Sequence, residues 1–75
     1  MNEFRRAQLS ASMIVCNYTV RALLSKIAGL ELDTKVSVEE KFSQIKKIKD
    51  EITKAGTEID SIKKEITLLN SYNLN

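Results

Sequence analysis

The sequence predicts an all-α fold, an antiparallel two-helix hairpin with coiled-coil heptads that is completed by oligomerisation or by a partner helix. Three observations lead to this prediction. Two long stretches repeat apolar residues at alternating steps of three and four, the spacing of helices that pack along a seam. A helix-capping pattern lies between them. The chain has no Pro and only two Gly, which leaves few sharp turns available.

The first predicted helix covers residues 3–30. From Ala7 to Leu30, 15 of 24 residues are apolar, and only Arg21 and Lys26 are charged. A second apolar stripe lies beside its seam, so the helix is apolar around most of its circumference, whereas a surface helix has one narrower stripe. We therefore expect burial on more than one side. The predicted partner-binding residues are those of the seam: Leu9, Met13, Cys16, Val20, Leu23, Ile27 and Leu30. The second stripe consists of Ala11, Val15, Tyr18 and Ala22, widened by Ile14, Leu24 and Ala28.

The predicted turn covers residues 30–37. Gly29 is a suitable helix C-terminus, and Ser37 followed by Glu40 matches a capping box at the start of the next helix. Asp33 is an alternative cap, and the alternating apolar residues here also allow a short extended piece. The two seams differ in register by four residues, which a turn explains. One continuous helix with a stutter is the alternative.

The second predicted helix covers residues 38–69 and has one narrow apolar face. From Glu39 to Thr67, 14 of 29 residues are charged and eight are apolar. Lys41 falls on the seam in the first turn, where its long side chain is expected to reach water. Ala55 is a small residue at another seam position. Residues 70–75 are expected to fray. The predicted coiled-coil seam is Ile45, Ile48, Ile52, Ile59, Ile62, Ile66 and Leu69.

Ordered charges flank this second seam. Three of its four g positions are acidic, and Lys49 and Lys63 occupy e positions. This order allows attraction between parallel copies of the helix. The alternative is that the charges form a solvated face above an intramolecular hairpin. The g positions are Gln44, Glu51, Glu58 and Glu65.

The 75 residues form one small domain, residues 1–75, with a modest core. A single Cys cannot form an internal disulfide and suggests a reducing compartment, so the expected location is cytoplasmic. Cys16 is expected to be a small buried hydrophobe, with a redox role as the alternative. No His accompanies it, so we expect no metal site and no cofactor.

Charge and motifs argue against several function classes. The net charge is +2 and acids interleave with the lysines, whereas nucleic-acid binding requires a concentrated basic face. Asn17, Arg21 and Lys26 interrupt the most apolar stretch, so no membrane span is expected. The chain has no His, no Gly-rich phosphate loop and no nucleophile with a base at motif spacing, so we expect no enzyme.

The sequence therefore indicates a non-catalytic protein–protein interaction module. The leading hypothesis is a small helical chaperone or adaptor that binds a helical client. Small helical-hairpin co-chaperones of bacterial secretion systems share this size and layout, which is an analogy of architecture alone. One alternative is a homo-oligomeric parallel coiled coil. Another is a small, phage-type regulator that blocks a larger protein or contacts nucleic acid through Arg5, Arg6 and Arg21.

Overall fold

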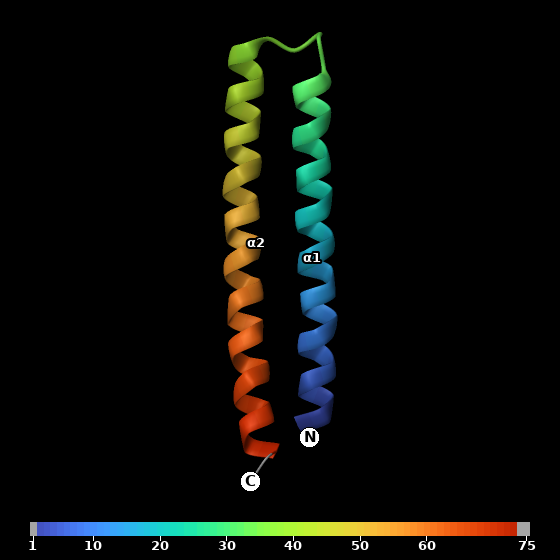
Figure 1. The fold of residues 1–75 in the computed structure, drawn as a ribbon, viewed down its shortest axis with the longest axis vertical. Coiled ribbons are helices and arrows are strands. Elements are labelled where there is room, and N and C mark those ends of the chain that lie inside the picture. Colours follow the sequence, from blue (N-terminus) through green and yellow to red (C-terminus); the bar gives the residue numbers. More distant parts are fainter. Residues whose placement is uncertain (1, 74–75) are drawn as a thin grey trace.

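The computed structural model describes residues 2–73, which form two long helices joined by a short turn. Helix α1 runs over Asn2–Leu32 and helix α2 over Val38–Asn73. The two helices lie side by side and run in opposite directions, with both chain ends at the end of the hairpin away from the turn (Figure 1). The molecule measures 58 × 14 × 13 Å, so the two helices form a narrow rod. The predicted all-α antiparallel hairpin is confirmed, and the single continuous helix is excluded.

The interface between the helices is built from the two predicted seams. Leu9, Cys16 and Leu23 are the buried apolar residues of α1, and they follow one another at intervals of seven. The other four residues of that seam, and the seven predicted seam residues of α2, are half-buried. From α2, Ala55 is also buried. Because each described helix has only the other to pack against, both seams face inward. Self-association and true coiled-coil packing stay predictions.

The turn confirms the Ser37 half of the predicted capping box, whereas the Glu40 carboxylate accepts from Gln44 Nε2 at 2.8 Å in place of the backbone N–H of Ser37. The backbone N–H of Glu40 donates to Ser37 Oγ at 3.1 Å, so Ser37 satisfies one of the free amides at the start of α2. Asp33 does not cap α2, because its carboxylate accepts from the N–H of Lys35 within the turn, at 2.9 Å. Lys41 reaches across the turn and donates to the carbonyl of Glu31 at 3.4 Å. That carbonyl belongs to the last turn of α1, where intrahelical partners run out.

Three predicted boundaries differ from those observed. Gly29 does not end α1, which continues to Leu32, and no glycine in the described chain has a positive φ. The observed turn is therefore confined to residues 33–37. α2 continues through Asn73, four residues beyond the predicted end, and the rest of the predicted frayed tail, residues 74–75, lies outside the described residues. Helix formation is cooperative, so one Gly of poor propensity does not stop a helix held by packing along its length.

Candidate functional site

The face of α1 turned away from α2 carries five of the nine large apolar side chains that are exposed among the described residues. Tyr18 lies nine residues from both Leu9 and Ile27, which is two and a half helical turns, so it stands opposite the seam. It is 73% exposed, and the neighbouring Ile14 and Val15 are each 64% exposed. We define the outer face of α1 by its exposed residues at and beside this line: Phe4, Ala7, Ala11, Ile14, Val15, Tyr18, Ala22, Ser25, Gly29 and Leu32.

The predicted partner-binding residues lie on the opposite side. All seven, from Leu9 to Leu30, are buried or half-buried at the interface with α2. They could contact another protein only if α2 moved away from them. Their role in partner binding stays a prediction, and the closed hairpin presents the outer face of α1 in their place.

One edge of the hairpin carries polar contacts between the helices. Arg5 of α1 donates two hydrogen bonds to Glu65 of α2, from Nε to Oε2 at 2.6 Å and from Nη2 to Oε1 at 3.1 Å. The hydrogen bond to Arg5, more than its charge, lowers the pKa of the Glu65 carboxyl below its ordinary value. This two-point contact fixes the register of the free end of the hairpin.

Replacing Arg5 with Gln should raise the pKa of Glu65 toward the ordinary value of about 4.3 for a glutamate. In the wild type the folded-state pKa lies below the unfolded one. The stabilisation from the pair is therefore present above about pH 4.3 and is lost as the pH falls through the folded pKa. NMR titration of the Glu65 carboxyl carbon in both proteins measures this directly. Equal pKa values in the two proteins would show that the pair is absent in solution.

The same edge continues to Cys16, whose thiol donates to Glu58 Oε2 at 3.3 Å. The hydrogen bond to Glu58, followed by burial, raises the pKa of the Cys16 thiol above its ordinary value. A raised pKa keeps the sulfur protonated at neutral pH, and a thiol is a poor nucleophile. The contact uses Cys16 as a small buried donor, in line with the predicted structural role.

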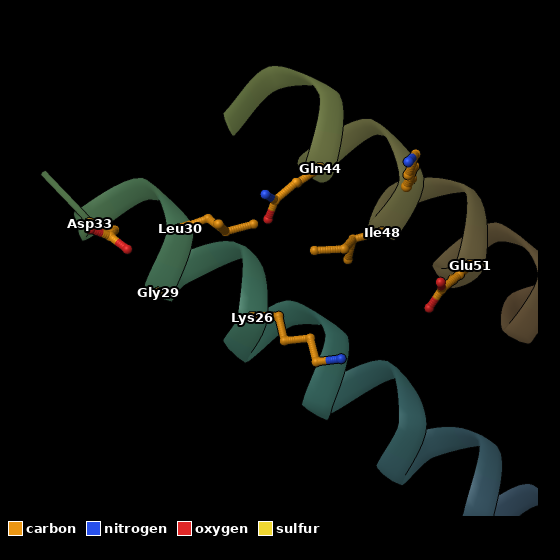
Figure 2. Close-up of a pocket in the computed structure, with 8 residues that line it drawn as sticks. Lys26, Gly29, Leu30, Asp33, Gln44, Ile48 and Glu51 are labelled. Carbon is orange, nitrogen blue, oxygen red and sulfur yellow. The ribbon is translucent and has the colours of Figure 1, made fainter. Parts of the chain in front are cut away.

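Two of the three g-position glutamates of α2 thus contact α1 of the same chain. The third, Glu51, lines an open groove of about 540 Å³ near the turn. Figure 2 shows Leu30 and Ile48 reaching into the space between the helices, with Lys26 and Glu51 along the rim. Lys47 and Asp33 also line the groove. With Lys26 and Glu51, the lining therefore contains two cationic and two anionic side chains. Such a balanced lining selects neither an anion nor a cation.

The described residues contain no group of three or more His, Cys, Asp or Glu side chains that could hold a metal ion. No membrane span was expected from the sequence, but by length and composition Glu3–Leu32 is apolar enough to cross a membrane. The core helix of a soluble protein and a signal sequence pass the same test. Only 11% of an 18-residue window in this helix is buried in the hairpin, and large apolar side chains such as Ile14 and Tyr18 are exposed.

The sequence identified part of the outer face and missed the rest. The second stripe, centred on Tyr18, was recognisable from its period. Phe4 and Leu32 lie outside the predicted stripe, yet they are 71% and 82% exposed and extend the face to both ends of α1. Both could have been found from their seven-residue spacing, because Ala11 lies between Phe4 and Tyr18 and Ser25 lies between Tyr18 and Leu32.

Comparison of the chain with known protein families, with curated proteins and with solved structures finds no significant match.

Proposed function

We propose that this chain is a non-catalytic protein–protein interaction module, a small helical chaperone or adaptor whose outer face of α1 binds a helix of another polypeptide. The observation that carries the proposal is the exposure of large apolar side chains along α1, from Phe4 to Leu32, on the side that α2 leaves uncovered. Contiguous exposed apolar patches of this kind mark interaction surfaces in soluble proteins.

The shape of the face favours a helical partner. Its residues follow one side of a straight helix of 31 residues, about 46 Å long at ~1.5 Å per residue. A cluster of large side chains, among them Ile14 and Tyr18, lies between the small residues Ala11 and Ala22 along it. Ridges of large residues between small ones are the surface into which a second helix packs. An amphipathic helix laid along a hydrophobic face is a recurrent mode of peptide recognition.

The parallel coiled coil is the second candidate, and it conflicts with the contacts inside the hairpin. In such a stalk the g-position acids of α2 would pair with lysines of neighbouring copies. Glu65 is already engaged by Arg5, and Glu58 accepts from Cys16. The nucleic-acid regulator is weakened for the same reason, because Arg5 is committed to Glu65 and the remaining arginines do not form a basic patch with it.

Site-specific photocrosslinking tests the proposal. The protein is made in cells with a benzophenone amino acid in place of Tyr18 and is crosslinked there by light. The matched control carries the same amino acid in place of Thr57, an exposed residue of α2. We expect crosslinked protein products from position 18 that are absent from position 57. Crosslinks from position 18 to lipid only, or none above the control, would overturn the proposal.

A further inference from the structure

We propose that the outer face of α1 binds the same face of a second copy of this chain, antiparallel, about a two-fold axis that passes at Tyr18. The inference rests on the proposed function, because a second copy occupies the same face that a client helix binds when the weak dimer dissociates. It assigns to this surface an isologous interface, in which the same patch from both copies is self-complementary.

The first support is the order of side-chain sizes along the centre of the face. At seven-residue steps the chain reads Phe4, Ala11, Tyr18, Ser25 and Leu32. The two outer residues are large, the next two are small, and an aromatic residue is central. An antiparallel pairing about Tyr18 places Phe4 opposite Leu32 and Ala11 opposite Ser25, so that layers of large side chains alternate with layers of small ones. The two central tyrosines then meet each other, and aromatic pairs add stability beyond the area they bury.

The residues on either side of this central line also pair favourably about the two-fold axis. In that register Ile14 of one copy lies level with Ala22 of the other, so a large side chain meets a small one. Ala7 lies level with Gly29, where an added Cβ would meet no atom of its own chain within 4 Å. The Ile14 pair sets a large residue against a small one, as interdigitated helix packing requires.

Charge selects the antiparallel orientation. Arg21, which is exposed, is the one charged residue close to the centre of the face. A parallel pair in register would bring the two Arg21 side chains together. In the antiparallel pair each Arg21 lies level with Val15 of the other copy, and the two guanidinium groups are separated along the axis by about 9 Å at ~1.5 Å per residue. Both can then reach water at the edge of the interface.

The composition of the face favours another helix over a bilayer surface. Helices that lie in the membrane interface insert bulky Trp, Phe or Leu side chains and carry many basic residues on the polar side. Half of the outer face of α1 is small: Ala7, Ala11, Ala22, Ser25 and Gly29. Small residues insert little area into lipid, but they let a second helix approach closely.

The area fits a weak, reversible dimer. An aromatic side chain buries about 150–250 Å², and Phe4 and Tyr18 are both about seven-tenths exposed. With Ile14, Val15 and Leu32 added, two copies can bury on the order of 1,000 Å², at the lower limit for a specific interface. We therefore expect an equilibrium between monomer and dimer at roughly micromolar or higher concentration.

Analytical ultracentrifugation of the full chain over a concentration series tests the association. We expect the wild type to approach twice its 8.5 kDa mass as concentration rises. Tyr18→Glu should weaken the dimer by at least about tenfold, because it buries an unpaired charge at the centre of the interface. Thr57→Glu, the same change at an exposed position of α2, should behave like wild type. Circular dichroism confirms that each variant keeps its helices.

Disulfide trapping tests the orientation. In a Cys16→Ser background, Tyr18→Cys should form a disulfide-linked dimer, whereas Phe4→Cys should form one only when mixed with Leu32→Cys. A wild type that stays monomeric, or self-linking of Phe4→Cys, overturns the inference. If the chain stays monomeric while position 18 still photocrosslinks to a different protein, the proposed function stands and the inference alone fails. Binding of the wild type to phospholipid vesicles without dimerisation overturns both.

Discussion

Replacing Leu23 with Ala should unfold most of the chain, whereas replacing its neighbour Leu24 with Ala should leave the hairpin intact. Leu23 is 5% exposed and belongs to the small buried set of the interface, while Leu24 is 52% exposed. Truncating a buried Leu to Ala costs about 2–5 kcal/mol, and a hydrophobic core of this size supplies only about 3–5 kcal/mol in total. Loss of one side chain can therefore remove most of the stability.

Urea and thermal unfolding followed by circular dichroism would measure this difference. Both variants change the same residue type by the same number of atoms, so they differ only in the side of α1 they touch. Leu24→Ala should stay within about 0.5 kcal/mol of wild type, as exposed substitutions usually do. Equal destabilisation by the two variants would mean that α2 packs on a different side of α1.

Replacing Gly29 and Gly56 with Ala should raise the stability by about 0.5–1 kcal/mol at each position. Both glycines lie inside helices, neither has a positive φ, and an added Cβ would meet nothing within 4 Å at either position. The gain comes from the lower backbone entropy of Ala in the unfolded chain. Gly29 and Gly56 lie far apart along the hairpin, so their effects should add.

Thermal unfolding at low protein concentration would show the change as a higher Tm, by roughly 4–8 °C for each kcal/mol in a domain of this size. The reverse substitution Ala28→Gly, at an exposed position beside Gly29, is the matched control and should lower the Tm by a similar amount. A lower Tm for Gly56→Ala would indicate that another chain occupies the open space at that position.

The parts of the fold that follow from local pattern could be predicted from the sequence. The seam from Leu9 to Leu30 repeats over three heptads, and the cap at Ser37 needs only Ser37 and the amide of Glu40, three residues later. The end of α1 could not be predicted in this way. Gly29 is a frequent C-terminal residue, but the helix ends where its carbonyls find other partners, as when Glu31 accepts from Lys41.

The polar contacts between the helices depend on a register that no local pattern contains. Arg5 and Glu65 are 60 positions apart, so their pairing can be seen only once the two seams are aligned. By sequence pattern alone, the acids of α2 fit either attraction between parallel copies or a solvated face. In the structure Glu58 and Glu65 meet α1 of the same chain.

The periodicity of α1 also could not predict which of its two apolar stripes faces α2. Both stripes repeat with a helical period, and the period alone does not say which one α2 covers. The seam with Leu23 and Ile27 buries more apolar area than a stripe with Ala11 and Ala22, so α2 covers the seam and leaves the outer face free. The predicted excess of apolar surface on α1 is present, but on the opposite side from the residues predicted to use it.

The rod shape of the hairpin has a consequence for its local dynamics. Each cross-section holds only two helices, and contacts near the turn join residues close in sequence, while Arg5 and Glu65 close a loop of 60 residues. Opening from the free ends breaks only the terminal layers and leaves the layers nearer the turn in place. Amide hydrogens should therefore exchange with solvent deuterium fastest near the chain ends and progressively more slowly toward Leu23, and Arg5→Gln should steepen this gradient.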